Sequence, residues 1–154
     1  MYKRDYIYVN LLLSLSNIAV VPCLILQLYK GEYLSFLISS YTAFFSGLYH
    51  AFEIKFGLEG VQKILGLSQY VNSKLYVPIL LNLDRFFAFS CVLYHFVFFK
   101  EQILDNVGVY NIGFSLFLMI VSELFGRFGY IDTFMFTQLF WHLTAYYILF
   151  LIYV

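Results

Sequence analysis

The chain has 154 residues, of which 62% are hydrophobic and 12% are charged, and its formal net charge is zero. This much apolar surface excludes a water-soluble domain of this length, and the lack of any cluster of Lys and Arg excludes a nucleic-acid partner, because phosphate binding needs concentrated positive charge. The composition therefore predicts an integral, multi-pass membrane protein whose main partner is the lipid bilayer.

Five apolar runs are each close to the roughly 20 residues that a helix needs to cross a bilayer. The first follows Lys3 and Arg4, as a secretory signal would, but it exceeds the roughly 7–15 apolar residues of a signal core, so we interpret it as a retained helix. No repeat or linker divides the chain. The sequence thus predicts one all-α domain over 1–154, a polytopic helical membrane bundle of about five transmembrane helices at about 6–29, 33–52, 75–99, 107–125 and 133–154.

The segment 53–74, between the second and third runs, separates its apolar and charged residues onto two faces of a helix. This pattern is typical of a short helix that lies in the membrane interface. It favours an ordinary amphipathic connector, with a lid or lipid-sensing element as the alternative.

Polar side chains recur inside the apolar runs, where each is costly and needs a partner. Ser46 and His50 are four residues apart, as are Gln138 and His142, so each pair projects from one face of a helix. Together with Asp84 from the third run, these side chains could meet in the bundle core. Two imidazoles, a carboxylate and a hydroxyl can hold zinc or orient a water for attack, or they can simply join helices through hydrogen bonds.

Three further polar residues have simpler interpretations. His95 lies eleven residues after Asp84, about 16 Å further along the helix axis, so it cannot share a metal with that carboxylate. We interpret it as an interfacial histidine, solvated or paired. Arg85 points away from Asp84, and Glu123 is its predicted partner in an intramembrane ion pair.

Two blocks of the chain resemble a known family. The segment 11–53, LLLSLSNIAVVPCLILQLYKGEYLSFLISSYTAFFSGLYHAFE, looks like the first two helices of the myomaker and transmembrane-protein-eight family, and 125–151, FGRFGYIDTFMFTQLFWHLTAYYILFL, resembles its last helix. The two blocks cover roughly half of the chain. This family belongs to a superfamily of membrane hydrolase-like proteins that includes alkaline ceramidases, adiponectin-type receptors and Per1-like lipid-remodelling proteins.

The resemblance implies a Ser-x3-His motif on helix two, an Asp on helix three and a His-x3-His motif on the last helix, with the three histidines binding zinc. Ser46, His50, Asp84 and His142 match this motif, but Gln138 stands where its first C-terminal histidine belongs. An amide oxygen is a poor zinc ligand beside imidazole. The family also has seven helices, whereas five are predicted here.

Two functions follow from these residues. One is a non-catalytic myomaker-like membrane protein that organises lipids or binds a partner, as related proteins act in membrane fusion. The other is a zinc-dependent lipid amide or ester hydrolase, with zinc on His50, His142 and Gln138, Asp84 as general base or orienting group, and Ser46 at the oxyanion or bound water. The lost histidine and the lost helices favour the first.

The charges and the resemblance predict opposite orientations. More Lys and Arg lie on the side of the amino terminus than on the side of Lys30 and Lys100, so the positive-inside rule places the amino terminus in the cytoplasm. The resemblance implies an external amino terminus, and we favour that orientation because losing two helices preserves it.

Overall fold

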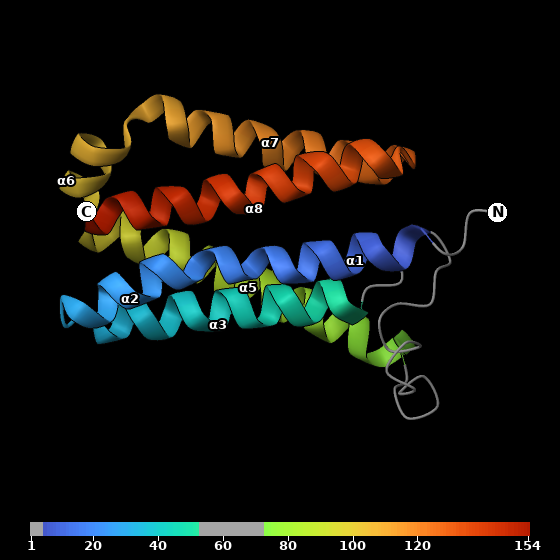
Figure 1. Cartoon of the computed structure of the whole chain (residues 1–154), viewed down its shortest axis with the longest axis horizontal. Helices are drawn as coiled ribbons and strands as arrows, with labels where there is room; N and C mark the ends of the chain where they lie inside the picture. The colour runs from blue at the N-terminus through green and yellow to red at the C-terminus, as the bar shows by residue number, and fades with distance from the viewer. Residues whose placement is uncertain (1–4, 53–72) are drawn as a thin grey trace.

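The structure is a computed structural model that describes residues 5–52 and 73–154 (Figure 1). All regular structure in these residues is helical, which confirms the predicted all-α class there. The amphipathic helix predicted over 53–74 lies, except for its last two residues, outside the described residues. The helices are α1 (Asp5–Ser16), η1 (Asn17–Val20), α2 (Val21–Tyr29), α3 (Tyr33–Phe52), α5 (Ser73–Phe98), α6 (Lys100–Gln102), η2 (Ile103–Val107), α7 (Val109–Phe128) and α8 (Ile131–Tyr153).

The first apolar run is one rod built from three helical pieces, α1, η1 and α2 (Figure 1). Pro22 lies in the first turn of α2. Because proline has no N–H, it cannot bond to the carbonyl of Ile18 four residues earlier. The Val21 N–H bonds to that carbonyl instead, in the tighter pattern of a 3₁₀ turn. The rod therefore changes its winding at Asn17–Val20.

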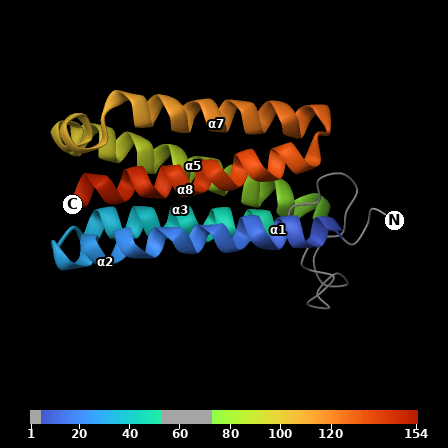
Figure 2. The same ribbon diagram turned by 45° about the horizontal axis from the view of Figure 1, so that its top comes forward.

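Helix α8 lies at the centre of the bundle. It packs on α7 along one side and on α1, η1 and α2 along the other, while α3 packs on both α1 and α5 (Figures 1 and 2). Helix α1 begins and helix α8 ends at opposite ends of the bundle (Figure 2). Because α8 packs on α1, η1 and α2, the first and last parts of the chain are neighbours in the core.

Within residues 5–52 and 73–154, four helical segments are long and apolar enough to cross a membrane: Val9–Tyr29, Tyr76–Phe98, Val109–Phe128 and Asp132–Tyr153. They agree closely with four of the five predicted spans. The fifth, α3, has 20 residues, but its serines, tyrosines and histidine lower its mean hydropathy, so it is not among the four.

Glycines set both ends of α7. Gly108 before the helix has φ = 76° and Gly129 after it has φ = 79°, and L-residues with a side chain rarely adopt such values. Helix α7 therefore begins at Val109 and ends at Phe128, each two or three residues later than the sequence predicted. The π-helical turn η2 fills the connection from α6.

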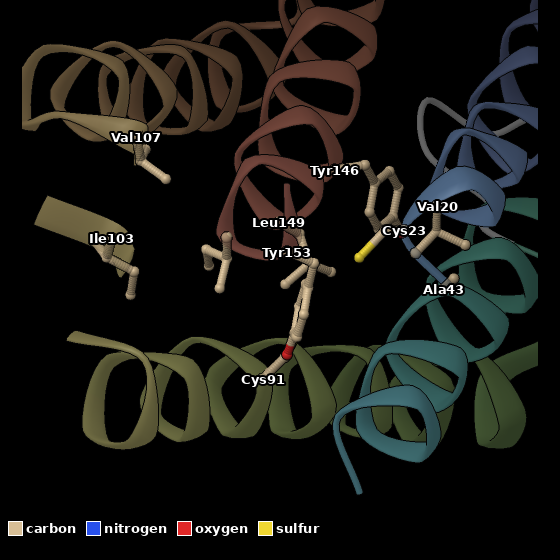
Figure 3. Close-up of a cluster of buried hydrophobic side chains, with 10 residues drawn as sticks. Val20, Cys23, Ala43, Cys91, Ile103, Val107, Tyr146, Leu149 and Tyr153 are labelled. Atoms are coloured by element: carbon tan, nitrogen blue, oxygen red, sulfur yellow. The ribbon is translucent and has the colours of Figure 1, made fainter. Parts of the chain in front are cut away.

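The main apolar core surrounds the last turns of α8 (Figure 3). Tyr146, Leu149 and Tyr153 pack between the first rod and α5. A smaller cluster of Val9, Leu13 and Phe134 lies toward the other end of α8. Between these two clusters, α8 carries Gln138 and His142.

Candidate functional site

His142 of α8 is the centre of a buried hydrogen-bond relay. Its Nδ1 lies 2.6 Å from the hydroxyl of Ser16, the last residue of α1. Its Nε2 lies 3.3 Å from the amide nitrogen of Gln138, one turn earlier on α8. The Ser122 hydroxyl of α7 in turn donates to the Gln138 amide oxygen. The relay joins α1, α7 and α8.

Donor chemistry fixes the direction of each bond in the relay. An amide nitrogen only donates, so Nε2 of His142 accepts from Gln138 and the ring proton is on Nδ1. The Nδ1–H then donates to the Ser16 oxygen, whose own hydroxyl proton goes to the Leu13 carbonyl at 2.6 Å. A neutral His142 therefore has both ring nitrogens bonded.

The predicted site residues on α3 and α5 lie close to this relay. The His50 ring centroid is 5.1 Å from that of His142, with the ring planes at 59°, and both side chains are buried. Ser46, Asp84 and His142 line one cavity of about 230 Å³ between α3, α5, α7 and α8. The structure thus brings all five predicted residues to one region, while their catalytic or metal-binding roles stay predictions.

Several residues of this region were not predicted from the sequence. Besides Ser16 and Ser122, Asn17 accepts a 2.5 Å hydrogen bond from the Tyr146 hydroxyl through its side-chain oxygen, and its amide nitrogen donates to the Leu13 carbonyl. A signal was available, because Ser16 and Asn17 are adjacent polar residues in the middle of an apolar run, where each needs a partner. Their partners could not be predicted from the sequence.

His95 forms a second tie, between α5 and the end of α8. Its Nδ1 lies 2.7 Å from the Cys91 carbonyl and its Nε2 lies 2.8 Å from the Tyr153 hydroxyl. A carbonyl only accepts, so Nδ1 carries the proton and Nε2 accepts from the tyrosine. Of the two states predicted for His95, solvated or paired, the structure shows the paired one, and the ring is buried.

The predicted ion pair between Arg85 and Glu123 is wrong. Glu123 instead pairs with Arg127 on its own helix, with Nε 3.2 Å from Oε1 and both side chains exposed. Helix α5 packs on α3 and helix α7 packs on α8, so Arg85 and Glu123 belong to separate helix pairs. Arg85 is exposed on α5.

The arrangement does not fit the zinc centre that the resemblance implies. Zinc needs a free lone pair on each ligand, but the single lone pair of neutral His142 accepts from Gln138, and the Gln138 oxygen accepts from Ser122. Among residues 5–52 and 73–154, no three His, Cys, Asp or Glu side chains are grouped so that they could hold a metal. Zinc binding would require the Gln138 amide to turn away from both partners.

Comparisons of this chain with protein-family models, with characterised proteins and with solved structures found no match. The resemblance to the myomaker family therefore depends on the two quoted blocks alone. The described part of the chain thus combines four helices able to cross a membrane with a buried relay among α1, α7 and α8.

Proposed function

We propose that this chain is a non-catalytic, multi-pass membrane protein of the myomaker-like family that organises lipids or binds a partner within the bilayer. The observation that carries this proposal is the use of both ring nitrogens of His142 in a closed relay. A histidine bonded in this way serves to join helices, because its polar groups find no other partners in hydrocarbon.

The relay supports a scaffold role through the helices that it connects. Ser16 of α1 precedes Ser122 of α7 and His142 of α8 by more than a hundred residues, and the His50 ring adds α3. Hydrogen bonds of this kind hold transmembrane helices in one arrangement. In this role, the residues that match the family's catalytic motif would stabilise the bundle.

The cavity supports a lipid as ligand. Most of its wall is apolar, with Val92, Ile112, Leu116 and Leu149 among the lining residues, and Ser46, Asp84 and His142 form a polar part. Such a wall suits an acyl chain, whose polar end group would lie against the hydroxyl, carboxyl and imidazole.

The alternative is a zinc-dependent lipid amide or ester hydrolase. It is favoured by the 5.1 Å separation of the His50 and His142 rings and by the shared cavity of Ser46 and Asp84. This function requires the Gln138 amide to leave His142, so that the imidazole lone pair faces a metal. The first function needs no such rearrangement.

Zinc content and lipid hydrolysis, measured on the same purified full chain, distinguish the two functions. We expect far less than one zinc per chain and no hydrolysis of lipid amides or esters. One zinc per chain, together with hydrolysis that is lost in His142→Ala, would show that the hydrolase is correct. Thr144→Val is a matched control on α8, since its hydroxyl bonds only to carbonyls of its own helix.

A further inference from the structure

One face of α5 carries a continuous row of exposed residues with a charge in it, and two members of the row, Val92 and Phe96, also line the cavity. Asn82, Arg85, Phe89, Val92 and Phe96 are all exposed, and they are spaced alternately by three and four residues. This spacing places them on the single face that a helix offers to a packed neighbour. We call this row the α5 stripe. Of the four segments able to cross a membrane, the one in α5 is the least buried, since only 6% of its apolar stretch is buried inside the bundle.

Arg85 lies near the middle of the membrane. It is nine residues after Tyr76 and thirteen before Phe98, the two ends of the span. At 1.5 Å per residue it is about 14 Å from the nearer end, close to half of the roughly 30 Å hydrocarbon thickness. A guanidinium at this depth is costly unless it is paired.

The described part of the chain offers Arg85 no ion pair. Glu123, the partner predicted from the sequence, forms an ion pair with Arg127 instead. Asp84 lines the cavity between the helices, about 100° around α5 from Arg85. Arg85 itself is exposed and is not one of the residues that line the cavity, so its charge faces outward from α5.

We propose that the α5 stripe binds a transmembrane helix of another protein that carries a carboxylate at mid-membrane depth. An Asp or Glu on that helix would form a bidentate pair with the Arg85 guanidinium. The Asn82 amide, one turn away, would hydrogen-bond the same helix. Phe89, Val92 and Phe96 would supply the apolar contact, so the partner helix would lie against the side of the cavity that Val92 and Phe96 line. This inference rests on the partner-binding part of the proposed function and names its partner class.

A second copy of this chain does not fit the stripe. All copies share one orientation in a membrane, so two α5 helices would meet parallel about a two-fold axis along the bilayer normal. Arg85 would then face Arg85, and like charges in hydrocarbon repel. The guanidinium thus selects an acidic partner against self-association.

The test uses a synthetic transmembrane peptide of Leu and Ala with one central Asp, reconstituted with the full chain in phosphatidylcholine vesicles. Trp141, the single tryptophan of the chain, serves as energy-transfer donor to a dansyl group on the peptide. We expect the Asp peptide to bind about tenfold more tightly than the same peptide with Leu in place of Asp, a typical gain for one polar interhelical contact. Arg85→Gln should remove this difference.

A charge-swap variant distinguishes the loss of the ion pair from a loss of folding. Arg85→Glu should lose the Asp peptide and gain a peptide with a central Lys. Glu123→Gln, which changes an acid on α7, should leave binding unchanged.

Equal binding of the Asp peptide by the wild type and Arg85→Gln would overturn the proposal. So would energy transfer between labelled copies of the chain that depends on Arg85, which would assign the stripe to self-association. A change confined to the binding of phosphatidylserine vesicles would assign Arg85 to lipid headgroups and would also overturn it. Zinc content and hydrolysis do not involve Arg85, so a failure here is distinct from a failure of the proposed function.

Discussion

The Ser16 hydroxyl lies 2.6 Å from Nδ1 of His142, and the two residues are 126 positions apart in the chain. This contact joins the end of α1 to the middle of α8 and orients the imidazole. With the proton on Nδ1, the other nitrogen faces Gln138. The tautomer of this buried histidine is therefore set by the donor-only amide nitrogen of Gln138, and the distant Ser16 accepts the ring proton that this tautomer places on Nδ1.

Ser16→Ala should destabilise the bundle by about 1–3 kcal/mol, because it leaves the Nδ1–H of buried His142 without an acceptor. Thermal unfolding of the detergent-solubilised protein measures this effect. Thr144→Val, which removes a hydroxyl bonded only within α8, should cost less than half as much. Equal costs for the two variants would show that the Ser16 contact does not stabilise the protein.

Gln138→His should increase zinc affinity, since it adds an imidazole one turn from His142 and removes the amide that bonds to its Nε2. Metal analysis after equilibration with a zinc buffer checks this. The double variant Gln138→His with His142→Ala should lose the gain. If Gln138→His holds no more zinc than the wild type, then His50, His142 and position 138 do not converge on one metal.

Tyr153→Phe and His95→Leu should each destabilise the end of α8, because each leaves one partner of a buried 2.8 Å hydrogen bond unsatisfied. The double variant replaces both partners and should cost less than the sum of the two single changes, by about 1 kcal/mol. Unfolding of the four proteins in a double-mutant cycle gives this coupling. Strictly additive costs would mean that the bond contributes nothing to stability.

Gly129→Ala should destabilise the protein by about 1–2 kcal/mol, because an alanine at φ = 79° is strained. Gly113→Ala is the matched control within α7. Nothing lies within 4 Å of a Cβ added there, and alanine is favoured over glycine inside a helix by about 1 kcal/mol. The two changes should therefore move the unfolding temperature in opposite directions, and shifts of the same sign would contradict this account.

The two termini should lie on opposite sides of the membrane, because α1 begins and α8 ends at opposite ends of the bundle (Figure 1). We expect the amino terminus to be external, as the family resemblance implies. Glycosylation-acceptor sites appended to each end measure this in cells. A modified carboxy terminus would instead favour the orientation that the positive-inside rule gives.

Local features of the sequence were enough to predict the helices. The length and apolarity of each run depend only on neighbouring residues, and four of the five predicted runs meet the requirements for a span. The four-residue spacing of Ser46 with His50 and of Gln138 with His142 likewise fixed which side chains share a helix face. The winding change near Pro22 and the late start of α7 after Gly108 are local too, but they depend on hydrogen bonds and dihedral angles that an apolar pattern does not record.

Only the tertiary structure decided which polar groups meet. The sequence indicated that Gln138, His142 and Arg85 each needed a partner, because hydrocarbon offers none. The sequence could not predict that Ser122 and Ser16 are the partners or that Arg85 faces outward, since this depends on which helices become neighbours. Helix α8 packs between α7 and the first rod, which brings Ser16 and Ser122 to Gln138 and His142, while α5 packs on α3 with Arg85 directed outward. Which helices become neighbours is decided by packing between separate segments, as distant in the chain as Ser16 and His142, and no local pattern carries that information.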